Sequence, residues 1–364
     1  MRRAWAMTAA ALVAGCLRQN PAFDGEGGTG GGSGGATTAS STTTSTTTTS
    51  TSAPTGTTDA STSSPTTSSS TTGVLPDMSS GTTETTGAPV GCWGLGVEDW
   101  AVESLGLDPP GSSPMLSPDA ETLHWRAFLG GQWHVVRSVR DDPAVAFPAG
   151  ASVWPSSSFE ADHPAFVAAT QELFFGGNGD IYVLPRDGDG WGVPTVAGGA
   201  LAFGNRVESH PNPTADGATL LFQRDDGPAW GQFQLGFKFW QVARDPQVHP
   251  SFPDVAPVEV TPADPGFGVL ACPALAPDGL RLFFGAFDSE GGGFGDPNDG
   301  RAGVWFAERD GLDAPWQGVT RSAQLRVPGF VTCPVAVSAD GCQLTLALFT
   351  IGPGTPESRI ARRG

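Results

Sequence analysis

Positive charge is scarce in this chain, and the shortage limits the partners that it can bind. The 364 residues carry 19 Lys and Arg against 37 Asp and Glu, which gives a formal net charge of −18 at pH 7, and Lys238 is the one lysine. A nucleic-acid-binding surface has to neutralise phosphates with clustered basic side chains. The composition therefore excludes nucleic acid as an expected partner.

Long hydrophobic runs are also scarce. The apolar stretch from Ala4 to Ala14 is well short of the roughly 20 residues that a membrane-spanning helix needs. It follows Arg2 and Arg3 and leads into Val13-Ala14-Gly15-Cys16. A charged start, an apolar stretch and small residues in this order are typical of an export signal, so we expect the protein to be exported.

Cys16 makes this signal more specific. The small residues before it resemble the cleavage motif of bacterial lipoproteins, in which the cysteine is acylated and becomes the new N-terminus. The resemblance implies a signal peptide over residues 1–15 and a palmitate-bearing lipid anchor at Cys16. Leu17 stands where inner-membrane lipoproteins typically carry Asp, which implies the outer membrane, on its periplasmic or cell-surface side. An ordinary cleaved secretion signal is the alternative.

Residues 16–90 contain few aliphatic side chains. From Gly25 to about Thr86 the sequence is almost entirely Gly, Ser, Thr and Ala, so it cannot bury enough apolar surface to offset the entropy of ordering. We expect a disordered linker whose reach, treated as a random coil, is roughly 45 to 50 Å. Only residues 91–364 are expected to fold.

A repeated phrase runs through the folding part of the chain. Each copy contains a proline, a short apolar stretch, a polar turn and a second apolar stretch, and the copies begin at Ser113, His163, His210, Cys272 and Cys333. Each is followed by a stretch with period-two alternation, which is typical of β-strands. These third strands are expected to end on arginine: Gln132 to Arg137, Ile181 to Arg186, Phe239 to Arg244, Val304 to Arg309 and Glu357 to Arg362.

Such repeats predict an all-β fold, a β-propeller with five blades. Tryptophan-rich stretches between the units supply a fourth strand, but none follows Arg362. The segment from Trp100 to Leu107 has a similar pattern, so we expect this N-terminal strand to complete the last blade and close the ring. Six blades are the alternative, if residues 145–160 or the segment around Val258 form a further sheet.

The turns carry a family resemblance. Ser117-Pro118-Asp119 and Ala276-Pro277-Asp278-Gly279 resemble the TolB-type propeller repeat, and the resemblance covers about residues 91–362. It implies a propeller fold, but the family includes binding proteins, propeller parts of peptidases and some sugar lyases, so it implies no single activity. The Asp-Gly pairs close hairpins and are expected to be structural.

Four cysteines remain after Cys16. An even number in an exported chain predicts two disulfides, with three connectivities open. Cys272 and Cys333 occupy the same repeat position as His163 and His210, the residue before the proline. This position predicts a ring near one end of the channel, holding either a Cys272–Cys333 disulfide, unpaired packing residues, or a zinc ion on the two histidines and two cysteines. The disulfide would leave Cys92 and Cys342 to tie the N-terminal segment to the last blade.

Other candidates lie in predicted loops. Trp154 and Trp230 are expected to be the better exposed ligand contacts, since most other tryptophans recur at core positions. The acidic glycine loops at residues 187–190 and 288–300 offer oxygen ligands for calcium, although such loops are usually solvated turns.

Two functions from different classes follow. The first is an outer-membrane lipoprotein that displays a non-catalytic propeller and binds a protein or glycan partner, with no cofactor. The alternative is a metal-dependent lyase or hydrolase acting on polysaccharide, with His163 and His210 holding the ion in the channel, helped by Glu160 or Glu208.

Overall fold

A computed structural model describes residues 91–94, 99–156, 161–198, 201, 206–225, 237–247, 252, 256–263, 268–288, 303–350 and 356–363. The predicted signal peptide, Cys16 and the linker lie outside these residues, as do Glu160 and Trp230. Among the described residues no helix is long and apolar enough to cross a membrane. The short 3-10 turn η2 (Cys92–Gly94) precedes the first strand.

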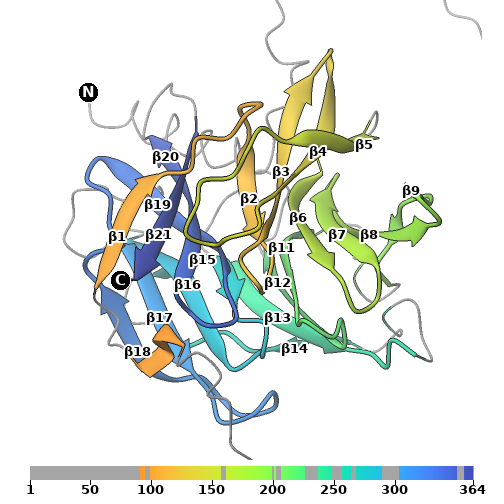
Figure 1. Cartoon of the computed structure of the whole chain (residues 1–364). Helices are drawn as coiled ribbons and strands as arrows, with labels where there is room; N and C mark the ends of the chain where they lie inside the picture. The colour runs from red at the N-terminus through yellow and green to blue at the C-terminus, as the bar shows by residue number, and fades with distance from the viewer. Residues whose placement is uncertain are drawn as a thin grey trace, which may run out of the picture. The chain divides into compact units, whose positions relative to one another are not determined.

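The described strands form five antiparallel sheets (Figure 1). Blade 1 contains β2 (Ser112–Leu116), β3 (Thr122–Leu129), β4 (Gln132–Val139) and β5 (Ala151–Ser156). Blade 2 contains β6 (Asp162–Val167), β7 (Glu172–Gly177), β8 (Asp180–Asp187) and β10 (Thr195–Val196), with β9 (Gly190–Trp191) paired to β8. Blade 3 contains β11 (Val207–Pro213), β12 (Thr219–Asp225), β13 (Phe237–Ala243) and β14 (Val258–Glu259). Blade 4 contains β15 (Gly268–Leu275), β16 (Arg281–Asp288), β17 (Gly303–Glu308) and β18 (Gln317–Ser322).

Blade 5 joins the two ends of the folded region. It contains β19 (Phe330–Val337), β20 (Gln343–Thr350), β21 (Glu357–Arg363) and, as its fourth strand, β1 (Trp100–Ser104). β1 pairs antiparallel with β21, with Trp100 opposite Arg363. The first strand of each blade contacts that of the next, and β19 contacts β2, so the ring closes. This confirms the five-bladed propeller and its closure by the N-terminal strand.

The six-blade alternative is wrong. β5 and β14, the strands of the two segments that could have formed a further sheet, pair with β4 and β13. They are therefore the fourth strands of blades 1 and 3. The central strands are buried on both faces because every blade packs between two others, which is why β7 and β16 are almost continuously apolar.

The repeated aspartate turns are structural, as predicted. The side chains of Asp119, Asp216, Asp278 and Asp340 each accept a hydrogen bond from the backbone N–H two residues ahead, at 2.8 to 3.0 Å. Gly217, Gly279 and Gly341 have φ between 71° and 74°, a conformation that glycine adopts without strain. The turn in blade 1 has Ala120 at φ 61° instead.

A buried arginine supports three of these turns. The Nε atoms of Arg140, Arg244 and Arg309 donate to the carbonyl groups of Ala120, Gly217 and Gly279, at 2.8 to 2.9 Å. The sequence spacing predicted that the third strand of blade 1 ends on Arg137, which is wrong. β4 extends to Val139, and the residue that reaches the turn is Arg140.

Candidate functional site

The five residues before the repeat prolines lie on the innermost strands. Ser113, His163, His210, Cys272 and Cys333 are all buried, and the first four have φ between 52° and 56°. Each of those four lies in a β-bulge of its strand. Because a bulge re-aims a side chain, the repeat places these residues in one ring around the channel. We call these five residues the channel ring.

The two histidines of the channel ring are in contact. The ring centroids of His163 and His210 lie 3.8 Å apart. His163 Nδ1 is 3.1 Å from Oδ1 of the buried Asp162, and Ser113 Oγ donates to the same oxygen at 2.5 Å. His210 Nδ1 lies 3.1 Å from Ser209 Oγ. The Nδ1 atom of each histidine therefore has a polar neighbour.

Burial and neighbouring groups set the protonation states of His210 and Asp162. Burial and the neighbouring His163 hold the pKa of His210 well below its usual range, so His210 is neutral at physiological pH. Burial alone would raise the pKa of Asp162, but Arg126 and the hydrogen bond with His163 hold it well below its usual range. Asp162 is therefore a carboxylate that bridges blades 1 and 2.

The two cysteines of the channel ring are bonded to each other. Cys272 and Cys333 form a disulfide between blades 4 and 5, with Cα atoms 5.4 Å apart. Cys92 and Cys342 form a second, which ties the segment before β1 to blade 5. Both pairs are those expected from ring closure. Disulfides persist in oxidising compartments, so the two bonds indicate an extracytoplasmic protein.

The disulfide removes two ligands from the zinc alternative. A zinc-binding cysteine has to be a thiolate, and the sulfurs of Cys272 and Cys333 are shared in a covalent bond. No group of three or more His, Cys, Asp and Glu in the described part of the chain is arranged to hold a metal ion. Two acidic glycine loops were the candidates for calcium. The first, at residues 187–190, is the turn that connects β8 to β9. Most of the second, residues 289–300, lies outside the described residues.

Glu208, the other carboxylate of the enzyme hypothesis, lies apart from this cluster. It is 1% exposed, and its carboxylate oxygens have no hydrogen-bond partner. Burial and the charge of Asp180 raise its pKa to about 8, so it is protonated at neutral pH. Its backbone N–H donates to Gly179 of the β7–β8 hairpin at 2.8 Å, which places Glu208 between blades 2 and 3.

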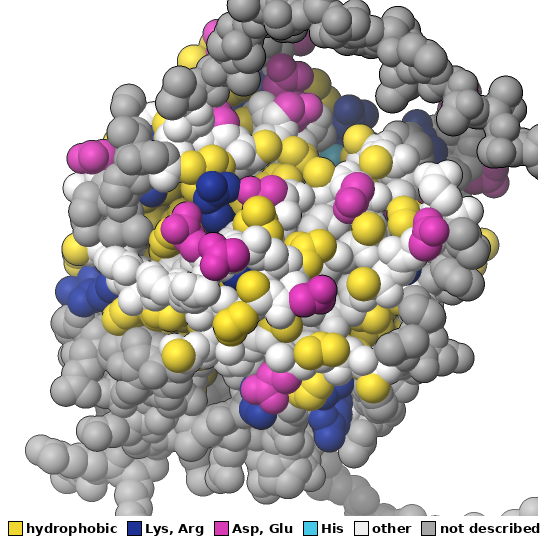
Figure 2. Space-filling model, turned by 90° about the horizontal axis from the view of Figure 1, so that it is seen from below, with side chains coloured by type: hydrophobic (Ala, Val, Ile, Leu, Met, Phe, Trp, Pro, Cys, Tyr) yellow, Lys and Arg dark blue, Asp and Glu magenta, His cyan; other side chains and the backbone are white. Residues whose placement is uncertain are grey.

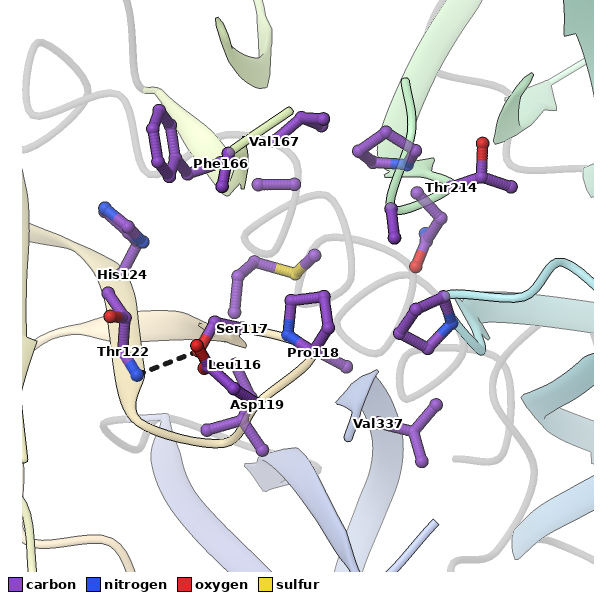
Figure 3. A pocket seen from close by; sticks show the side chains of 18 of the residues that line it. Leu116, Ser117, Pro118, Asp119, Thr122, His124, Phe166, Val167, Thr214 and Val337 are labelled. Atoms are coloured by element: carbon purple, nitrogen blue, oxygen red, sulfur yellow. Dashed lines mark hydrogen bonds between the residues drawn. The ribbon is translucent and has the colours of Figure 1, made fainter. Parts of the chain in front are cut away.

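A cavity of about 450 Å³ lies where all five innermost strands end (Figure 3). Its lining is mostly apolar, with side chains from every blade: Met115, Leu116, Val167, Pro213, Leu275, Pro277 and Val337. Ala168 and Ala215 are exposed lining residues. In Figure 3 Leu116 and Pro118 point into the same space as Val167 and Val337. The sequence did not reveal this cavity, because its lining residues look like ordinary core positions.

Three of the polar side chains that line the cavity, Ser117, Asn212 and Thr214, already have local partners. Ser117 Oγ donates to Asp119 and accepts from the Thr122 N–H. Asn212 donates to the carbonyls of His210 and Pro273 and accepts from Leu275, and Thr214 donates to Asp216 at 2.6 Å. Among the described lining residues no pair of carboxylates faces the space. The mostly apolar lining therefore suits an apolar ligand group.

The surface around this end is acidic. Asp119, Asp216, Asp278 and Asp340 are exposed on the four turns that surround the cavity. Figure 2 views the propeller from this end, where hydrophobic and acidic side chains are interspersed and Lys and Arg lie mostly toward the edge. Arg281 pairs with Asp278 at 2.7 Å and neutralises part of this charge.

His124 in the cavity wall makes stability depend on pH. Burial and the charge of Arg137 lower its pKa to about 3, whereas an unfolded histidine titrates near 6.5. Between these values the unfolded chain binds the extra proton, so stability falls as pH drops below 6.5. This group alone is expected to cost about 2 kcal/mol between pH 7 and pH 5.

Chemical denaturation of the wild type and His124→Phe at both pH values tests this expectation. The difference in unfolding free energy between the two proteins should be smaller at pH 5 than at pH 7, because the unfolded variant has no imidazole at this position to take up a proton. Phe166→Leu, which alters the ring 5.7 Å from His124 without changing a titrating group, should lower stability equally at both pH values. An unchanged pH dependence in His124→Phe would contradict the assignment.

Trp154 is not in a loop, which corrects the sequence prediction. It lies in β5, is half-buried, and contacts Phe175 of blade 2 at a centroid distance of 5.1 Å. It therefore packs between blades 1 and 2. The more exposed aromatic residue is Phe128 of β3, which is 47% exposed and lies 5.2 Å from the Trp133 ring.

Comparison with known proteins gives similarity of fold alone. No protein-family model and no curated protein matches the chain. Among solved structures, TolB from Acinetobacter baumannii is 13% identical with a TM-score of 0.40, covering 70% of this chain and 54% of that chain, so the chain spans about half the length of TolB. The α-L-arabinofuranosidase PaAbf62A from Podospora anserina is 14% identical with a TM-score of 0.46, and the match covers 72% of this chain and 96% of that chain. An endo-arabinase from Bacteroides thetaiotaomicron is 13% identical with a TM-score of 0.44, and the match covers 73% of this chain and 98% of that chain. No functional statement rests on these matches.

Proposed function

We propose that this protein is an outer-membrane lipoprotein whose propeller is a non-catalytic binding head for a protein partner. The observation that carries the proposal is the cavity at the channel end: its lining is mostly apolar, and Ser117, Asn212 and Thr214 in it are already hydrogen-bonded to neighbouring protein groups. Such a site offers contact area to an apolar side chain. Because most of the lining is apolar, a protein side chain is favoured over a glycan.

The charge around the cavity adds a feature of the partner. Four exposed aspartates surround the opening, and surfaces of opposite charge speed association and exclude wrong partners. The expected partner presents an apolar side chain flanked by basic residues. Binding should therefore weaken as salt is added.

Closing the cavity tests the binding proposal. Ala168 and Ala215 are exposed lining residues, so tryptophan at either position fills the opening without disturbing the core. We expect Ala168→Trp and Ala215→Trp to reduce binding at least tenfold and to change the unfolding free energy by no more than about 0.5 kcal/mol. The measurement is crosslinking of the tagged full chain to envelope proteins in intact cells.

Ala169→Trp is the matched control, since Ala169 is exposed on the same turn and does not line the cavity. It should leave crosslinking unchanged. Equal crosslinking by all three variants would show that the cavity is not the binding site. Capture of polysaccharide in place of protein would support the glycan alternative.

The lipid anchor has its own test. Cys16→Ser should abolish labelling by radioactive palmitate and release the protein from the membrane fraction, because acyl chains supply the attachment. A variant that remains in the outer-membrane fraction would contradict anchoring through Cys16. This result is independent of the cavity variants, so the two parts of the proposal can fail separately.

A further inference from the structure

Two polar side chains in the cavity wall differ from Ser117, Asn212 and Thr214 in having no partner. Arg137 is exposed, His124 is 3% exposed, and both line the cavity. Neither makes a hydrogen bond or an ion pair with another of the described residues. A buried imidazole and an arginine without a counter-ion are therefore available to a ligand in the cavity.

The two side chains are neighbours on blade 1. Arg137 of β4 stands directly opposite His124 of β3 in the antiparallel register. Side chains at opposite positions lie on the same face of the sheet, with Cβ atoms about 4.5 to 5.5 Å apart. A guanidinium is a cation with several N–H donors, and a neutral imidazole has one donor. Adjacent donors of this kind suit an anionic acceptor such as a carboxylate.

We infer that Arg137 and His124 bind the C-terminal carboxylate of the protein partner, while the apolar side chain of the same terminal residue fills the cavity. The site so described rests on the proposed function, since it names the group of the partner that enters the cavity. Capture of a chain end through its carboxylate is a recurring mode of peptide recognition.

Apolar groups adjoin the two donors. The ring of Phe166 in blade 2 lies 5.7 Å from the ring of His124, and Figure 3 shows these two side chains next to each other at one edge of the cavity. A ligand that uses both features needs a negative group beside an apolar one. The last residue of a peptide carries both on one Cα atom, whereas an internal apolar residue carries no charge there.

The aspartates around the opening limit the other charges of the partner. Asp119, Asp216, Asp278 and Asp340 are exposed on the surrounding turns, and they repel a segment with several acidic side chains. A single terminal carboxylate adds one negative charge, and Arg137 neutralises it. The favoured partner therefore ends in an apolar residue and carries basic residues just before it.

The experiment selects peptides on the purified full chain. A library of short synthetic peptides with random sequences and free C-termini is enriched for binders. The affinity of each enriched peptide is then measured by fluorescence polarisation, both as the free acid and as the C-terminal amide. Ala215→Trp, which closes the cavity, identifies the peptides that bind there.

We expect enrichment of peptides that end in an apolar residue preceded by basic residues. Amidation should weaken their binding by about 10-fold to 100-fold, the loss expected when hydrogen bonds to a charged group are removed. Arg137→Gln should weaken binding of the free acid by a similar factor and leave binding of the amide unchanged, because only the acid brings a charge to this side chain.

Two further variants of the cavity wall test the role of His124, and one outside the cavity is the control. His124→Phe removes the second donor and should also weaken binding of the free acid, whereas His124→Gln keeps an N–H donor and should retain most of it. Arg186→Gln is the matched control, because Arg186 is exposed on the third strand of blade 2 and does not line the cavity. It should leave both affinities unchanged. Circular dichroism of each variant separates loss of the site from loss of the fold.

Failure of this inference is distinguishable from failure of the proposed function. Equal affinity for acid and amide, among peptides that Ala215→Trp excludes, would overturn the carboxylate site and leave the cavity as the binding site. The same holds for peptides that depend on an internal Asp or Glu in place of the chain end. Enrichment of no peptide, or binding that survives Ala215→Trp, would reject the proposed function together with this inference.

Discussion

Glu172→Ala is expected to destabilise the propeller by about 3 to 5 kcal/mol, because it leaves a buried arginine without its counter-ion. Glu172 begins β7 of blade 2, and both its oxygens accept from the guanidinium of Arg244, the residue after β13 of blade 3. The two side chains are nearly inaccessible to water, at 9% and 1% exposure. Guanidinium denaturation of the wild type and the variant gives the difference directly.

Glu357→Ala is the matched control. Glu357 pairs with Arg359 at the surface, where the side chains are 45% and 30% exposed, so its loss should cost less than about 1 kcal/mol. A cost of that size for Glu172→Ala as well would show that the link between blades 2 and 3 is dispensable. Glu172→Gln, which keeps a hydrogen-bond acceptor, should fall between the two.

Removing the Cys92–Cys342 disulfide is expected to cost about 2 to 5 kcal/mol and to loosen the closure of the ring. The bond spans 250 residues and fixes the segment just before β1. In that segment the Cys92 N–H donates to Asp340 O at 2.7 Å, and Arg363 donates to Cys92 O at 2.7 Å. Without the bond, β1 can leave β21 by local unfolding.

The double variant Cys92→Ser, Cys342→Ser should therefore show faster hydrogen exchange at β1 and β21 as well as a lower unfolding free energy. The double variant Cys272→Ser, Cys333→Ser is the control. The bond that it removes spans 61 residues, so the chain-entropy model predicts that the unfolding free energy falls by about 1 kcal/mol less. Hydrogen exchange at β1 should not become faster in this variant. Equal exchange at β1 in both double variants would contradict the role of Cys92–Cys342 in closure.

The repeat made most of the fold predictable. Its five prolines and aspartate turns marked the blades because a blade is a local unit, in which each strand pairs with the next along the chain. Closure by the segment at Trp100 was also predictable, since blade 5 would otherwise lack a fourth strand and expose a sheet edge. The same reasoning offered the Cys272–Cys333 disulfide as one alternative, because equivalent positions in neighbouring blades lie close together, and the structure decided between the alternatives.

Contacts between blades were less predictable. The pairing of Glu172 with Arg244 joins residues 72 positions apart, and nothing in the local sequence distinguishes them from exposed charges. Arg137 and Arg140 are three residues apart, and only the length of β4 decides that Arg140 reaches the turn. Trp154 was assigned to a loop because β5 follows a long connection without clear alternation.

The sequence by itself determined the propeller class, the closure by the N-terminal strand and the repeat position of the channel ring, because these depend on patterns repeated within each blade, whereas the choice of five blades over six needed the pairing of β5 and β14. Tertiary structure alone decided that Asn212 in the cavity is already hydrogen-bonded, that the Glu208 carboxylate is buried without a hydrogen-bond partner, and that the histidines of the channel ring touch. These features depend on how side chains from different blades meet. That geometry is set by packing across the ring and leaves no periodic trace along the chain.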